Sequence, residues 1–239
     1  MDFNFNNLKE TSFASTSGQY LKPYDIYDVT LTKIEKTTLK GSKDPNATYP
    51  IVALEFTGCG DSKGVFSTNI FIPTTKEDGV RPVFQNKEGH DYERPSRFEN
   101  FQFTLMQIVH ALNPAGEEKI KENGSKIQSI FEKDFNKGVD LFLDLVIKAL
   151  TGKNNIATKL KLVGKITNGT TYAALPNSCG LNKAGEIFPV NFIGDNVFFT
   201  NYELTQQKAY KEAKPTDMAK VENNPDEPAD DLDLTNIEL

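Results

Sequence analysis

The chain has 239 residues, of which 38% are hydrophobic and 25% charged, and its formal net charge is −6. This length fits one enlarged domain, and the apolar content excludes a chain that is disordered throughout. Two cysteines are too few for a disulfide scaffold, no apolar stretch reaches the ~18 residues of a transmembrane helix, and the N-terminus carries no secretory pattern. We therefore expect a cytoplasmic protein without a membrane partner.

The negative charge is concentrated at the C-terminal end. Residues 222–239 contain seven Asp and Glu and no Lys or Arg. Without them, residues 1–221 hold 27 basic and 26 acidic residues, a net charge of +1. The acidic segment also ends on Leu234, Ile237 and Leu239. A purely solubilising tail would explain the acids but not the apolar tip, so we favour a segment that binds a partner.

Three alternating segments predict β-strands in the first third of the chain: residues 24–39, 50–57 and 64–73. In the second, Val52, Leu54 and Phe56 fall on the face expected to be buried. In the first, the alternation slips at Lys33, so that Ile34 takes the next apolar place. One extra residue in a strand indicates a β-bulge, which bends the strand.

The period then changes to that of helices. Apolar residues recur three and four apart in residues 98–114, and helical patterning continues in 125–135 and 138–153. Strands return at 157–177, where Asn168-Gly169 predicts a tight hairpin turn. Three strands, helices and two strands is the order of an OB-fold. The predicted fold class is mainly β with a helical insertion (α+β), an OB-fold-like five-stranded barrel with helices between strands 3 and 4.

This order predicts three parts of the chain. Residues 1–20 form a flexible N-terminal arm, 21–210 an OB-fold-like domain with its helical insertion at about 98–153, and 211–239 a disordered acidic C-terminal tail. Residues 178–204 hold an apolar cluster that five strands do not require, which we interpret as an extra hairpin.

All three arginines of the chain, Arg81, Arg94 and Arg97, lie between residues 81 and 97, together with Phe84 and Tyr92. A guanidinium group pairs with phosphate and stacks on flat rings. Aromatic side chains stack on exposed bases, each worth about 1–3 kcal/mol. This segment therefore predicts contact with single-stranded nucleic acid, and the alternative is a surface loop whose rings pack on the domain.

Two sets of lysines extend this prediction. One set shares a face of the predicted strand at 157–167 and the other lies in the predicted loop after the first strand, where both could follow a phosphate backbone. The alternative is a solvated strand face. Phe71 points away from the predicted core, as a stacking platform or as part of a second core. The candidate nucleic-acid-binding residues are Lys36, Lys40, Lys43, Phe71, Arg81, Phe84, Tyr92, Arg94, Arg97, Lys159, Lys161 and Lys165.

The sequence offers little support for catalysis. It contains no P-loop, no GxSxG motif and no dinucleotide-binding fingerprint. Cys59, Cys179, His90 and His110 lack the close spacing of zinc ligands. We expect no enzymatic activity, no metal site and no cofactor.

The segments "GQYLKPYDIYDVTLTKIEKT", "YPIVALEFTG", "KGVFSTNIFIP", "FQFTLMQIVHAL" and "KLKLVGKITNGTTYAALP" are similar to the pattern of phage OB-fold single-stranded DNA-binding proteins of replication and recombination. The resemblance covers about residues 18–177. It implies that the acidic tail recruits replication or recombination proteins. The residues implied for that role are Asp230, Asp231, Leu232, Asp233, Leu234, Ile237, Glu238 and Leu239.

The leading hypothesis is thus a non-enzymatic protein that binds and protects single-stranded DNA with little sequence preference during phage replication or recombination. The competing hypothesis is a scaffold or virion-assembly module on a similar barrel, which would keep the acidic tail but not bind DNA. Both hypotheses are compatible with a homo-oligomer.

Overall fold

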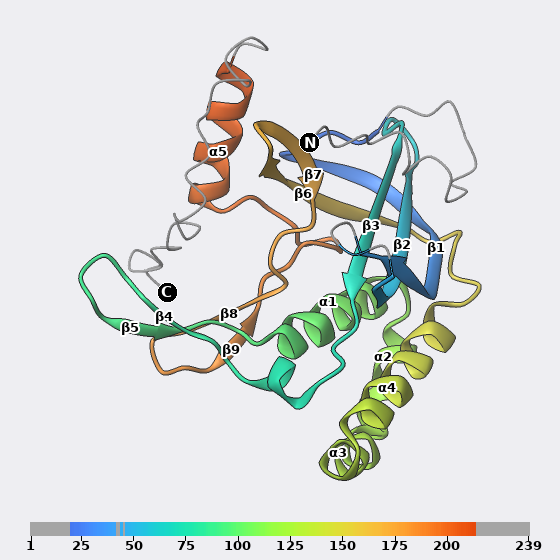
Figure 1. Ribbon diagram of the computed structural model, residues 1–239. Coiled ribbons are helices and arrows are strands. Elements are labelled where there is room, and N and C mark those ends of the chain that lie inside the picture. Colours follow the sequence, from blue (N-terminus) through green and yellow to red (C-terminus); the bar gives the residue numbers. More distant parts are fainter. Residues whose placement is uncertain (1–19, 42–43, 45, 214–239) are drawn as a thin grey trace.

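The computed structural model describes residues 20–41, 44 and 46–213 and has a mixed α+β fold built on a five-stranded antiparallel sheet (Figure 1). The strand order is β3-β2-β1-β6-β7. The strands are β1 (Asp25–Lys40), β2 (Thr48–Gly58), β3 (Val65–Phe71), β6 (Ala157–Thr167) and β7 (Thr170–Ala174). The three predicted strands before the helices and the two after them are confirmed.

The alternation of the strands sorts side chains between the two faces of the sheet. Val52, Leu54 and Phe56 are buried, as predicted. The register between β1 and β2 shifts between Leu31 and Lys33, which confirms the predicted bulge. The bulge lets the 16-residue strand β1 pair with β6 at its start and with β2 along most of its length.

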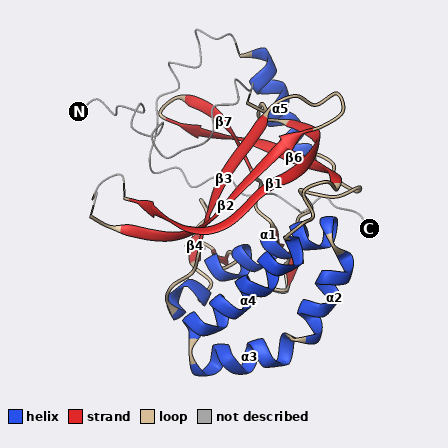
Figure 2. Cartoon of the chain, turned by 90° about the vertical axis from the view of Figure 1, so that its right-hand side faces the viewer, coloured by secondary structure: helices blue, strands red, loops and turns tan. Residues whose placement is uncertain are grey.

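Four helices follow β3 in the chain and lie on one side of the sheet, where α1 and α4 contact the strands and α3 packs on α4 (Figure 2). They are α1 (Arg97–Leu112), α2 (Pro114–Glu122), α3 (Gly124–Lys133) and α4 (Phe135–Leu150). The apolar stripe predicted for the first helix is buried, from Phe101 to Leu112. With the inward residues of the sheet these helices form one hydrophobic core.

Helix α2 was not predicted. Asn113-Pro114 ends α1, as expected, but it also begins α2, because Pro114 occupies the first helical position, where no backbone N–H is needed. The Asn113 side chain accepts a hydrogen bond from Gly116 N at 3.1 Å and donates one to Ala149 O at 2.7 Å. One side chain thus caps α2 and ties it to α4.

Three hairpins complete the fold. β6 and β7 are joined by Asn168-Gly169 with φ of 51° and 74°, which confirms the predicted tight turn. β8 (Cys179–Leu181) and β9 (Ile187–Pro189) form the extra hairpin expected in residues 178–204. β4 (Val83–Gln85) and β5 (Asp91–Glu93) form an unpredicted hairpin after the short 3-10 helix η2 (Lys76–Gly79), and it projects from the body in Figure 1.

The sheet is open, so the barrel expected from the sequence is not established. In the described part of the chain β3 and β7 are its edges and do not pair with each other. Short segments extend the sheet at two strands: Leu21 N donates to Val65 O of the edge strand β3 at 3.1 Å, and Lys161 N of β6 donates to Phe192 O at 2.7 Å. A last helix, α5 (Asn201–Glu212), was also not predicted and lies apart from α1–α4 (Figure 1).

Candidate nucleic-acid interface

Two aromatic rings are exposed on the face of the sheet that is turned away from α1–α4, called here the outer face. Phe71 on β3 is 56% exposed and Tyr49 on β2 is 47% exposed. Their ring centroids lie 6.2 Å apart in an edge-to-face arrangement. Of the two alternatives for Phe71, an exposed platform or a second core, the structure supports exposure. Tyr49 was missed, although it has the opposite parity to Val52, Leu54 and Phe56.

Predicted lysines lie on the same face, on β6. Lys159 and Lys165 are exposed, and Lys165 pairs across the β6–β7 ladder with Tyr172, a ring that is 49% exposed. Tyr172 was also missed, although it follows directly from the predicted hairpin register. Lys40, the last residue of β1, is exposed at the far end of the sheet, but it has the strand parity of Val52 and Leu54 and so lies on the opposite face.

Acidic side chains interrupt this positive charge. Asp28 is the β1 partner of Lys159, and Glu55 is the β2 partner of Lys33. Glu55 also accepts a hydrogen bond from the hydroxyl of Thr32 at 3.1 Å. The outer face therefore combines rings, lysines and carboxylates, and is not a uniformly positive groove.

Lys161 does not lie in an exposed row with its two neighbours, so that part of the prediction is wrong. Its side chain is 1% exposed. Its ammonium group lies 2.9 Å from the carboxylate of Glu203 and donates to Phe198 O at 3.1 Å. Strand parity placed Lys161 correctly on the outer face, but α5, more than thirty residues later in the chain, covers it.

The first lysine set is also rearranged. Lys36 lies in β1 and not in a loop, and it falls on the helix-facing side of the strand, where its Nζ is 2.6 Å from Oδ1 of Asp140 on α4. This pair crosslinks sheet and helix, and it corrects the predicted role of Lys36 as part of a loop that contacts phosphate. Lys43 lies outside the described residues, as do the predicted partner-binding residues 230–239.

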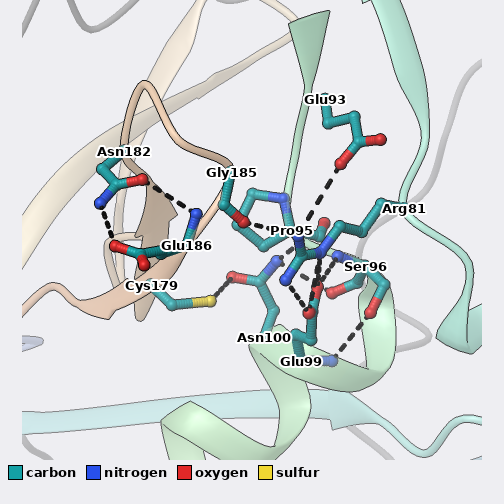
Figure 3. Close-up of polar contacts among 10 residues, drawn as sticks. All are labelled: Arg81, Glu93, Pro95, Ser96, Glu99, Asn100, Cys179, Asn182, Gly185 and Glu186. Atoms are coloured by element: carbon teal, nitrogen blue, oxygen red, sulfur yellow. Dashed lines mark hydrogen bonds and ion pairs between the residues drawn. The ribbon is translucent and has the colours of Figure 1, made fainter.

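Arg81 is held by the protein itself (Figure 3). Its Nε and Nη2 donate to Oε1 of Glu99 on α1 at 2.9 and 2.7 Å, and Nη1 donates to Gly185 O in the β8–β9 turn at 2.8 Å. Glu93 of β5 is 3.8 Å away. The guanidinium group thus joins three elements at the base of the β4–β5 hairpin, which corrects its predicted role as a nucleic-acid ligand.

The partner of Arg81, Glu99, also caps α1. It accepts from Ser96 N at 2.7 Å, while Ser96 Oγ accepts from Glu99 N at 3.1 Å. Burial raises the pKa of Glu99, but the hydrogen bonds from Arg81 and Ser96 outweigh it, so the net pKa is lowered. The carboxylate therefore remains ionised at neutral pH.

Above this base, the β4–β5 hairpin carries a stack of flat groups. The rings of Phe84 and Tyr92, cross-strand partners, are stacked at 5.9 Å. The guanidinium carbon of Arg94 lies 4.5 Å from the Phe84 ring centre, and its Nη2 donates to the Tyr92 hydroxyl at 2.7 Å. Of the predicted loop residues, these three come together in one hairpin.

Arg97 does not join that stack. Its side chain is 83% exposed at the start of α1, where Nη1 lies 3.3 Å from Oδ1 of Asp78 in η2. It is thus a solvent-facing cation at the base of the hairpin.

Two of the groups considered for catalysis, Cys179 and His110, are occupied by contacts within the protein. Cys179 is buried, and desolvation raises the pKa of its thiol to about 11. His110 lies 2.6 Å from Glu117 of α2, beside a cleft of about 350 Å³ between α1 and residues 189–196. Among the described residues no three His, Cys, Asp or Glu side chains are grouped as metal ligands would be.

In the part of the chain that the structure describes, no helix has the length and apolar content needed to cross a membrane.

Comparisons of the chain with protein-family models, curated proteins and solved structures returned no match. The functional assignment therefore rests on the residues and their geometry.

Proposed function

We propose that the protein is a non-enzymatic single-stranded DNA-binding protein that coats unpaired strands during phage replication or recombination. The observation that carries this proposal is the exposed pair of Tyr49 and Phe71 on the outer face of the sheet. Exposed rings are costly to keep in water, and bases stack on them without regard to sequence. The exposed lysines Lys159 and Lys165 on the same face would supply phosphate contacts.

Two features give further support. In chain order, the helices lie between β3 and β6, the third and fourth of the five sheet strands. This order fits an opened OB-type barrel, a fold that holds oligonucleotides on one face of its sheet. The Phe84–Arg94–Tyr92 stack offers a second surface of flat and cationic groups on a projecting hairpin. Together they favour DNA binding over the competing scaffold function, which requires neither.

Substitution of Phe71 tests the proposal. Phe71→Ala is expected to weaken binding of a single-stranded oligonucleotide about 5- to 100-fold, because one base loses its stacking surface. Phe71→Leu is the matched control: it keeps an apolar side chain but not the flat ring, and it should lose nearly as much. Fluorescence anisotropy measures the affinity and thermal melting verifies the fold. Full affinity in both folded variants would argue against stacking at this site.

The proposal includes a recruiting role for the acidic segment at the C-terminal end. Deleting residues 226–239 is expected to leave DNA affinity unchanged or higher, because an anionic competitor is removed, and to abolish capture of replication or recombination proteins. Pull-down with replication proteins, alongside a DNA titration, measures both effects. Unfolding of residues 20–213 on truncation would contradict a recruiting tail.

A further inference from the structure

Lys161 occupies the centre of a lysine row on the outer face but is withheld from solvent. Lys159, Lys161 and Lys165 share one strand parity, and the two outer members are exposed while Lys161 is 1% exposed. The groups that satisfy it, the Glu203 carboxylate and Phe198 O, come from the start of α5 and the residues just before it. The Phe199 ring centre lies 5.8 Å from the ammonium nitrogen. One segment thus neutralises and covers this cation.

Few contacts attach α5 to the sheet. No residue of α5 is buried, and Tyr202 and Leu204 are 42% and 45% exposed. Besides the Lys161–Glu203 pair, Gln207 donates to Tyr24 O at 2.7 Å and the Tyr24 and Tyr210 rings lie 5.5 Å apart. A helix that buries little apolar surface gains little from docking, so it can leave the body without global unfolding.

We propose that α5 is a displaceable cover on the outer face, and that a phosphate group of single-stranded nucleic acid competes with Glu203 for Lys161. Release of α5 would expose Lys161 between Lys159 and Lys165 and lengthen the cationic row. Because binding linkage is reciprocal, nucleic acid that favours release of α5 is itself bound more weakly while α5 is docked. This inference rests on the proposed function and adds the way in which its binding surface is controlled.

Charge-neutral variants of α5 test the competition. Glu203→Gln is expected to raise the affinity for a fluorescent single-stranded oligonucleotide about 3- to 10-fold at low salt, because one anionic competitor is lost. The salt dependence should steepen by about 0.7 in log K against log salt, since one more phosphate is neutralised. In Lys161→Gln/Glu203→Gln the gain should disappear.

Glu212→Gln is the matched control. Glu212 lies on the same helix, 67% exposed and 4.0 Å from Lys208, so the variant makes the same change in net charge away from Lys161. It is expected to change the affinity less than 2-fold. Equal gains in Glu203→Gln and Glu212→Gln would reduce the effect to net charge and overturn the cover.

Hydrogen exchange on the wild-type protein gives an independent readout, which decides the question even where a variant is misfolded. Adding the oligonucleotide should speed amide exchange in residues 201–212, because the helix is released. Unchanged or slower exchange there, with binding retained, overturns the cover and leaves the proposed function standing. Failure of both wild type and Glu203→Gln to bind overturns the proposed function and the cover together.

Discussion

At the scale of single residues, the surroundings of each cation decide its role. The guanidinium group of Arg81 is occupied by Glu99 and Gly185, whereas that of Arg94 is stacked on a ring of a projecting hairpin. Equally, Lys36 and Lys161 are tied to carboxylates on α4 and α5, while Lys159 and Lys165 are exposed. Side chains of one type, close in sequence, therefore have different surroundings: Lys36 and Lys161 link elements of the fold, whereas Lys159 and Lys165 face solvent.

The ion pair of Arg81 predicts a pH effect on stability. The pKa of Glu99 is lowered in the folded protein, so its stabilising contribution is present above the unfolded pKa of about 4.3 and is lost as pH falls through the lower folded value. Arg81→Gln is expected to lower the thermal midpoint by a few degrees at pH 7, with a smaller difference from wild type near pH 3.

Scanning calorimetry at pH 7, 5 and 3 measures this dependence. Lys63→Gln, which removes a positive charge at an exposed site, is the control and should behave as wild type. A difference between Arg81→Gln and wild type that stays constant with pH would contradict the assignment of the effect to Glu99.

At the scale of elements, close approach between helices fixes the helical layer. A Cβ placed on Gly138 of α4 would lie 2.5 Å from the Phe131 ring and 2.9 Å from its backbone, so α3 and α4 meet there with no space for a side chain. Phe131 in turn packs against Phe98 of α1 at 4.9 Å between ring centroids. The absence of a side chain at Gly138 therefore lets Phe131 of α3 pack against both α4 and α1.

Gly138→Ala is expected to destabilise the protein by about 1–3 kcal/mol, because overpacking outweighs the better helix propensity of alanine. Gly124→Ala is the matched variant: nothing lies within 4 Å of a Cβ at this α3 position, so stability should be unchanged or up to about 1 kcal/mol higher. Urea denaturation of both variants measures the difference. Equal stability of the two would contradict a close contact at Gly138.

Some elements of the fold could be predicted from local sequence patterns and others could not. Alternation predicted the inward residues of β2, the bulge near Lys33 and the turn at Asn168-Gly169, because each depends on neighbours in sequence. Helix α5 escaped prediction because none of its residues is buried and it has no apolar stripe. Lys161 is buried by a partner 42 residues away, and Arg81 is held by Glu99 and Gly185, 18 and 104 residues away, so no local pattern predicts either environment.

At the scale of the whole molecule, the two faces of the sheet carry different side chains. Its inner face packs on α1–α4 and forms the core, while its outer face presents Tyr49, Phe71 and Tyr172 with exposed lysines. The β4–β5 hairpin extends from the same body (Figure 1) and carries the Phe84–Arg94–Tyr92 stack. Flat rings and cations thus occur together on two exposed parts of one fold.

The most direct test of the central claim is an equilibrium titration of the wild-type protein with matched single- and double-stranded oligonucleotides at several salt concentrations. The account predicts that the single strand is bound more tightly than the duplex, and that its affinity falls linearly in log K against log salt as cations are released from the phosphates. An affinity that is independent of salt, or equal for single strand and duplex, would contradict it.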